Sequence, residues 1–105
     1  IQIVPLKESI FNRCKSNIAW IEATWSGAAT LGPDLPESMQ PGITNYNTMN
    51  PESFEYQLEK LIQSPGLVKR NYEASFKYIE KNLLLSKINK KRLDVIDILC
   101  PGGLL

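Results

Sequence analysis

Histidine is absent from this chain of 105 residues. Its absence excludes a histidine general base, a serine–histidine triad and a histidine metal ligand within this segment. Cysteine is scarce: Cys14 and Cys100 are far apart and fit no ligand motif, so a disulfide scaffold is not indicated. No cluster of Cys, Asp and Glu has metal-ligand spacing, and we expect neither a metal nor a cofactor.

The chain also lacks a charge excess and a long apolar run. Its 12 basic and 11 acidic residues leave a net charge of +1, and its longest basic cluster is Lys90-Lys91-Arg92. We therefore expect no nucleic-acid partner. No apolar run approaches the roughly 20 residues that a membrane span needs. There is no signal-peptide pattern, so we expect a cytoplasmic location. Neither a Walker loop nor a G-x-G-x-x-G motif occurs.

What is present is the composition of an ordinary globular domain, with 43% apolar and 22% charged residues. This length predicts a single domain over residues 1–105. The chain starts at Ile1 and enters directly into a β-branched segment, as a domain taken from a longer polypeptide would. We therefore expect further strands upstream, in a parent protein.

The first half alternates between strand and helix signals. A short buried strand is predicted over residues 1–4, a small-residue strand over 28–31, and a third strand over 43–46. Ser16 is a suitable N-cap for a helix over residues 17–26. This helix is predicted to have an apolar face of Ile18, Ile21 and Trp25 and to end at Gly27. A polar loop is predicted over residues 6–15, and a rigid proline- and glycine-rich loop over 32–42.

The second half is predicted to be helical. Asn50 and Pro51 favour a helix start, and Pro65-Gly66 would end that helix. A second helix is expected over residues 68–85, a break over 86–89, and then a last helix. The expected apolar positions are Phe54, Leu58, Leu61 and Ile62, then Tyr72, Phe76, Ile79 and Leu83, then Leu93, Val95, Ile96 and Leu99, before Pro101-Gly102-Gly103. The predicted fold class is α/β: a partial Rossmann-like domain with short parallel strands and a helical C-terminal half.

The first predicted helix has two candidate ligand-binding positions. Lys15, Ser16 and Asn17 stand at its start, where unpaired amides and a cation would favour a phosphate. The alternative is an ordinary capped helix with a solvated lysine. Glu22 stands between apolar neighbours in the same helix. Its carboxylate either lies on the exposed face or is held there to bind a ligand.

Two acids, Asp34 and Glu37, follow the second predicted strand. A loop at the carboxyl end of a strand is well placed to contact a ligand, although both acids could equally be solvated turn residues. The two acids are three residues apart in an irregular loop, which fixes no distance between their carboxylates. The pair therefore gives no basis for predicting glycoside hydrolysis.

Cys14 lacks a general base beside it and is not expected to be a nucleophile. The aromatic side chains are spaced for packing.

An ordered set of residues over 1–47 resembles the C-terminal domain of two-domain glycosyltransferases of the GT-B fold. The matching residues are Phe11-Asn12, Lys15-Ser16-Asn17-Ile18, Trp20, Glu22-Ala23, Gly27, Pro33 and Leu35-Pro36-Glu37. The resemblance implies transfer of a sugar from a nucleotide diphosphate sugar to an acceptor. It places Lys15, Ser16 and Asn17 near the diphosphate and Glu22 on the ribose hydroxyls, with Asp34 and Glu37 as possible donor contacts.

The resemblance further implies that acceptor binding and any catalytic base belong to an upstream N-terminal domain. No catalytic residue is assigned here, and the segment alone is expected to be inactive. Many members of the family have a glutamate facing the donor sugar, eight positions before the ribose glutamate. Cys14 occupies that position, which leaves the sugar and the stereochemical outcome open. The alternative function is a non-catalytic α/β module that binds a nucleotide or a partner protein.

Overall fold

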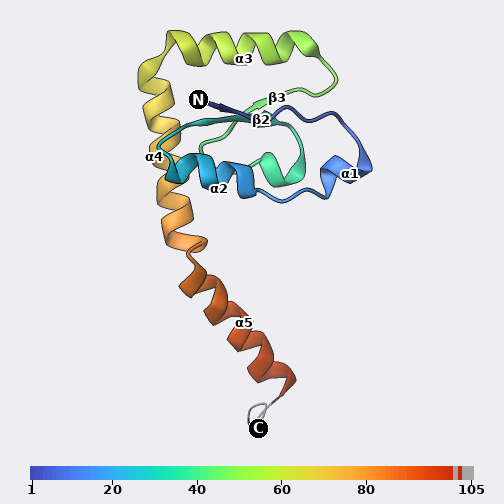
Figure 1. Cartoon of the computed structure of the whole chain (residues 1–105), viewed down its shortest axis with the longest axis vertical. Coiled ribbons are helices and arrows are strands. Elements are labelled where there is room, and N and C mark those ends of the chain that lie inside the picture. Colours follow the sequence, from blue (N-terminus) through green and yellow to red (C-terminus); the bar gives the residue numbers. More distant parts are fainter. Residues whose placement is uncertain (101, 103–105) are drawn as a thin grey trace.

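Three short parallel strands lie side by side among helices (Figure 1). The computed structural model describes residues 1–100 and 102. The strands are β1 (Gln2–Ile3), β2 (Thr30–Pro33) and β3 (Thr44–Tyr46), in the spatial order β1-β2-β3. The predicted parallel pairing is therefore confirmed, and β2 is the central strand.

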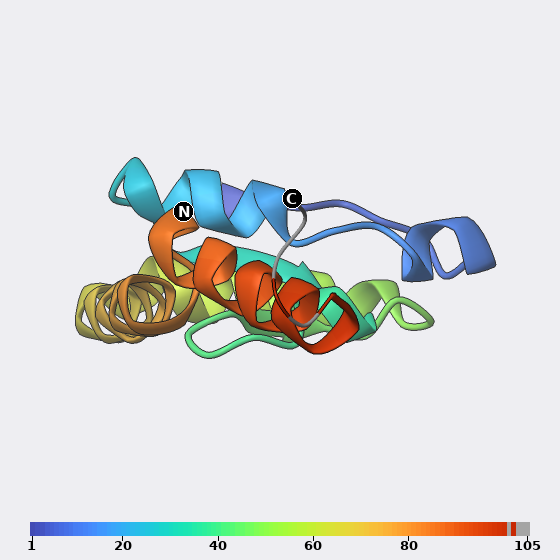
Figure 2. The same cartoon turned by 90° about the horizontal axis from the view of Figure 1, so that it is seen from below.

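Helices account for most of the described residues. They are α1 (Ile10–Arg13), α2 (Ile18–Trp25), the short 3₁₀ helix η1 (Pro36–Ser38), α3 (Pro51–Gln63), α4 (Pro65–Asn82) and α5 (Leu85–Leu99). The fold is thus mixed α/β with a small parallel sheet. Seen from below, the segment with α1 and α2 forms a layer along one side of the molecule (Figure 2).

Local signals account for several element ends. The Asn50 side chain accepts a hydrogen bond from the Glu52 amide at 3.1 Å, and Pro51 is the first residue of α3. This confirms the predicted helix start, since an N-cap oxygen satisfies an amide that the helix cannot. Gly27 follows α2 with φ at +87°, which confirms the predicted glycine after the helix.

One cluster of core residues lies on one face of the sheet. Leu31, Tyr46 and Leu61 are buried together, and the rings of Tyr46 and Phe54 meet edge to face at 5.1 Å. This cluster packs α3 against β2 and β3. Because side chains alternate along a strand, Thr30 and Leu31 lie on opposite faces of the sheet.

The opposite face of the sheet is covered by α2, which is tied to α4. The Trp20 indole donates to the Ser75 hydroxyl at 3.0 Å, and that hydroxyl donates to the Pro41 carbonyl at 2.9 Å. One buried serine thus links α2, α4 and the loop before β3. The sheet therefore has helices on both faces, and the layer formed by α2 also builds the candidate site.

The N-terminal strand differs from its prediction. Residues 1–4 were expected to be buried, but β1 spans only Gln2–Ile3 and both of its residues are exposed. Ile1 and Ile3 remain 46% and 37% exposed. The reason is its edge position, since within the described chain β1 pairs only with β2. A strand pattern cannot distinguish an edge strand from a central one.

The bounds of the elements from residue 6 to the end of β2 also differ from the prediction. Residues 6–15 contain α1, because the Ser9 hydroxyl accepts from the Asn12 amide and starts a helical turn. Helix α2 begins at Ile18, one residue later than predicted, with Asn17 and not Ser16 as N-cap. Strand β2 begins two residues later than predicted and includes Gly32 and Pro33, which were assigned to the loop.

The predicted apolar face of α2 is wrong. Ile18 and Trp25 are 56% and 51% exposed. The buried side chains are instead Trp20, Ala23 and Thr24. The helix is short and apolar nearly all round, so its periodicity did not distinguish the two faces. The Trp20 bond to Ser75 and the sheet beneath α2 decide which face is buried.

The helix boundaries after residue 64 are displaced as well. Pro65 begins α4 instead of preceding it, and the break falls at Leu83 and Leu84 rather than over 86–89. Proline is well accommodated at the first helical position, where its missing amide costs no hydrogen bond. Of the expected α3 face, Leu61 is buried but Ile62 is 64% exposed.

Helix α5 extends away from the sheet (Figure 1). It contains no buried residue, and its predicted apolar stripe is exposed at Leu93, Val95 and Leu99. The helix ends at Leu99 with Cys100 as its C-cap. The predicted stop at residues 101–103 lies largely outside the described residues.

Candidate functional site

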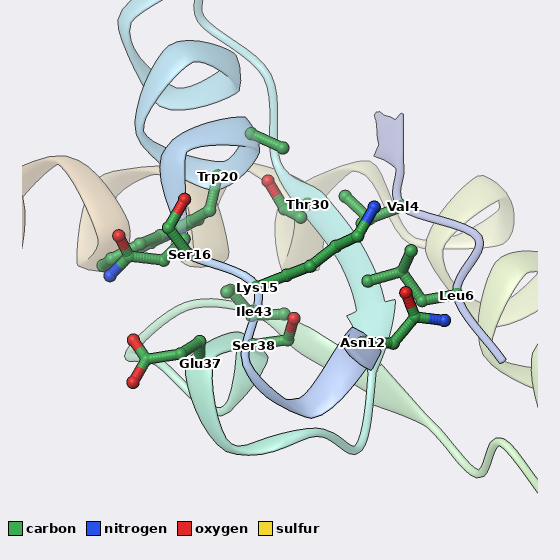
Figure 3. A pocket seen from close by; sticks show the side chains of 12 residues that line it. Val4, Leu6, Asn12, Lys15, Ser16, Trp20, Thr30, Glu37, Ser38 and Ile43 are labelled. Carbon is green, nitrogen blue, oxygen red and sulfur yellow. The ribbon is translucent and has the colours of Figure 1, made fainter. Parts of the chain in front are cut away.

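A cavity of about 180 Å³ lies between the start of α2 and the face of the sheet that bears Thr30 (Figure 3). Loops that follow β1 and β2 form its sides. Typical pockets for drug-sized ligands hold about 300–1,000 Å³, so this cavity accommodates one part of a larger ligand. It is lined by Val4, Leu6, Asn12, Lys15, Ser16, Asn17, Ala19, Trp20, Thr30, Glu37, Ser38 and Ile43.

The start of α2 supplies hydrogen-bond donors to this region. The first bond in the helix runs from the Ile21 amide to the Asn17 carbonyl at 3.2 Å. The amides of Ile18, Ala19 and Trp20 therefore have no acceptor within the helix. The Asn17 side chain makes no capping hydrogen bond. Uncapped amides at a helix start carry partial positive charge and favour an anion.

Lys15 adds a full positive charge beside the helix start. Its side chain is exposed, and its ammonium nitrogen lies 5.2 Å from the centre of the Phe11 ring. In Figure 3 the side chain extends across the cavity from the chain just before α2. Arg13 is not among the lining residues. Its ion pair with Glu8 raises the pKa of Arg13 and engages that charge elsewhere.

Thr30 stands out among the lining residues because its hydroxyl is buried and unpaired. The residue is 2% exposed, and its Oγ1 has no hydrogen-bond partner within the described chain. A buried hydroxyl without a partner costs about 1–3 kcal/mol. Native structures keep few such groups, and their positions often coincide with sites that a water or a ligand completes.

The structure brings four of the six predicted site residues to this cavity. Lys15, Ser16 and Asn17 line it together with Glu37, which comes from η1. In Figure 3 the Glu37 carboxylate and the Lys15 ammonium lie on opposite sides of the view. Both side chains are exposed.

Sequence reasoning missed three polar lining residues, Asn12, Thr30 and Ser38. Thr30 was treated only as part of a small-residue strand. A threonine within an apolar strand was the available signal, but only the register of β2 shows which face it lies on.

Glu22 lies outside the cavity but close to it along α2. It is exposed and borders a shallow depression with Gln2, Ala19, Ala23, Ser26 and Ala28. Ala19 lines both the cavity and this depression. Four residues of α-helix separate Ile18 from Glu22, a rise of about 6 Å. A ligand seated at the helix start could therefore extend along α2 to this carboxylate.

Asp34 lies away from the cavity and has a structural role. Its carboxylate oxygen accepts hydrogen bonds from the Thr48 amide at 3.1 Å and the Thr48 hydroxyl at 3.0 Å. It therefore joins the end of β2 to the loop after β3. Among the described pockets, none includes Asp34, so the two predicted acids do not form a pair at one site.

The described residues offer no other conspicuous chemical centre. Residues 1–100 and 102 hold no group of three or more Asp, Glu or Cys side chains that could bind a metal ion. No helix in the same part of the chain has the length and apolarity to cross a membrane. Comparison with protein-family models, curated proteins and solved structures finds no match for this chain.

Proposed function

We propose that this chain is the donor-binding part of a glycosyltransferase and binds a nucleotide diphosphate sugar at the start of α2. The observation that supports this most directly is the cavity that joins uncapped helix amides, the Lys15 cation and the unpaired Thr30 hydroxyl. A helix start favours a diphosphate. The unpaired hydroxyl is an independent sign that the cavity takes a ligand.

The arrangement of elements supports the same proposal. A small parallel sheet with helices on both faces is compatible with a partial Rossmann-like domain, in which ligands bind beside the carboxyl ends of strands. Val4 and Leu6 follow β1, and Glu37 and Ser38 follow the central strand β2. With the diphosphate at the α2 start, Glu22 takes the ribose, because a carboxylate can accept from both hydroxyls of a diol.

The remaining parts of the reaction belong to another domain in this proposal. An upstream N-terminal domain would bind the acceptor and supply any base, and further upstream strands would continue the present sheet at the exposed edge of β1. The transfer would take place in the cleft between the two domains. The two cysteines, which form no disulfide with each other, are consistent with a cytoplasmic location for such an enzyme.

A second candidate function is a non-catalytic α/β module that binds a nucleotide or a partner protein. The exposed apolar side chains of α5 favour it, since large exposed apolar areas often mark protein contacts. The cavity beside α2 plays no role in the protein-binding form of this alternative. A ligand titration therefore distinguishes a donor-binding domain from a module that binds only protein.

The test is a titration of the full chain with uridine and guanosine diphosphates and their sugar conjugates, followed by backbone amide shifts. We expect shifts over residues 15–22 with one base. Glu22→Ala should weaken binding about 10- to 100-fold, because hydrogen bonds to a charged group contribute about 1.5–3 kcal/mol. Glu73→Ala, an exposed glutamate on α4, is the matched control and should bind as the wild type does. Absence of shifts at millimolar ligand would contradict the proposal.

A further inference from the structure

The cavity beside α2 has a gradient of polarity. Its charged lining residues, Lys15 and Glu37, are exposed. Trp20 and Thr30 are each 2% exposed, and the half-buried Val4 lines the same cavity (Figure 3). The rim is therefore charged, and the floor of Val4, Trp20 and Thr30 has one unpaired hydroxyl. Half-buried polar groups are added by Asn12, Asn17 and Ser38.

The floor is unsuited to a phosphate. An anion buried among apolar groups needs several donors or a paired cation, and one threonine hydroxyl supplies a single donor. The cation and the helix amides lie at the start of α2, where the diphosphate would remain close to solvent. The floor instead fits an uncharged group that can exchange one hydrogen bond with Thr30 and bury carbon against Val4 and Trp20. A sugar ring with hydroxyl groups has this chemistry.

We infer that Thr30 is a specificity-determining residue, whose hydroxyl hydrogen-bonds a hydroxyl group of the donor sugar in the floor of the cavity. This inference rests on the proposed function and adds to it the position of the sugar. The resemblance leads us to expect a carboxylate facing the donor sugar at position 14, but this chain has Cys14 there. The Thr30 hydroxyl would provide a polar contact to the sugar in its place. Within the described chain the Thr30 Oγ1 has no hydrogen-bond partner and almost no exposed surface, so a ligand group that reaches the floor would supply the missing hydrogen bond.

The inference predicts opposite effects on stability and on binding for one substitution. Thr30→Val keeps the branched shape and removes the hydroxyl. Without ligand it should leave the midpoint of thermal unfolding unchanged or raise it, because it removes an unpaired buried polar group. It should lower affinity for the nucleotide sugar about fivefold, but leave affinity for the matching nucleoside diphosphate unchanged. Thr30→Ser, which keeps the hydroxyl, should retain the preference for the sugar conjugate.

The experiment is calorimetric titration of the wild-type chain, Thr30→Val and Thr30→Ser with one nucleoside diphosphate and its sugar conjugate, together with thermal unfolding of each. A selective loss of sugar-conjugate affinity in Thr30→Val supports the inference. Equal losses for both ligands, or no loss, overturn it and leave the donor-binding proposal intact. A lower unfolding midpoint for Thr30→Val would show that the hydroxyl already has a structural partner, and would also overturn it. No binding of either ligand to the wild type overturns the inference and the proposed function together.

Discussion

Gly42 and Gly27 have almost the same backbone conformation in different surroundings. Their φ angles are +86° and +87°, in the region that side-chain-bearing residues rarely adopt. A Cβ at Gly42 would collide with the Ser75 hydroxyl and the Asn71 carbonyl, and would lie 2.8 Å from the Ser75 amide. A Cβ at Gly27 would meet nothing within 4 Å. Gly42 therefore allows the loop before β3 to approach the backbone of α4.

This difference gives a paired prediction. Gly27→Ala should cost about 1–2 kcal/mol of unfolding free energy, the usual penalty of a left-handed conformation. Gly42→Ala should cost about 2–5 kcal/mol, because displacement of the α4 backbone adds an overpacking penalty of about 1–3 kcal/mol. Urea unfolding of both variants measures the difference. Equal losses would show that the loop yields to the new methyl group and that its contact with α4 is not tight.

Prediction of single residues succeeded where the signal is local. Asn50 caps α3 and Gly27 follows α2, since each depends on a few neighbouring backbone groups. The role of Thr30 depends on what lies above its face of the sheet, which no neighbouring residue reveals. Asp34 is similar: its partner Thr48 is 14 residues away, beyond β3.

At the scale of elements, α3 and α5 both have apolar residues at helical spacing, but the apolar side chains of the two helices are buried to different extents. Leu61 on α3 is 1% exposed within the core, whereas Leu93 on α5 is 59% exposed. Helical periodicity indicates that a helix has an apolar face. It does not indicate whether anything packs against that face; of these two helices, α3 packs against the sheet and α5 does not.

We therefore expect the same substitution to have unequal effects in the two helices. Leu61→Ala should destabilise the protein by about 2–5 kcal/mol, the usual cost of a cavity in a core. Leu93→Ala should change the unfolding free energy by no more than about 0.5 kcal/mol, as exposed substitutions do. Both values come from urea unfolding with the slope of the transition as a check. A loss above about 2 kcal/mol for Leu93→Ala would mean that α5 packs against the domain in solution.

The boundaries of elements were predicted less well than their existence. All three strands and the long helices were expected, but the break between α4 and α5 was placed several residues too late. Helix α3 ends just before Pro65, as predicted, but Pro65 also begins α4, because proline is favourable at a first helical position. The short α1 was missed, since its capping residue Ser9 lies in a polar segment that resembles a loop.

The whole molecule is elongated. Its radius of gyration over Cα atoms is 16.8 Å and its principal extents are 56 × 31 × 15 Å. A compact domain of this length would have a radius of gyration of about 13 Å. The projection of α5 away from the sheet contributes to this difference (Figure 1).

Small-angle X-ray scattering of the dilute chain tests this shape. We expect a radius of gyration well above the roughly 13 Å of a compact domain, with a pair-distance distribution that has an extended tail. Because self-association would also increase the measured radius, the molecular mass must be determined from the same sample. A monomer with a value close to 13 Å would show that α5 folds back onto the domain.

The sequence by itself determined the class of fold, the parallel strands and the helix that begins near Lys15, because these follow from local capping, turn residues and apolar runs. It also determined which residues stand together at that helix start, since they are consecutive. Only the tertiary structure decided which face of α2 is buried, that Glu37 joins the cavity while Asp34 does not, and that the Thr30 hydroxyl is unpaired. These outcomes depend on the packing of segments that are distant in the chain, and periodicity within one segment contains no information about them.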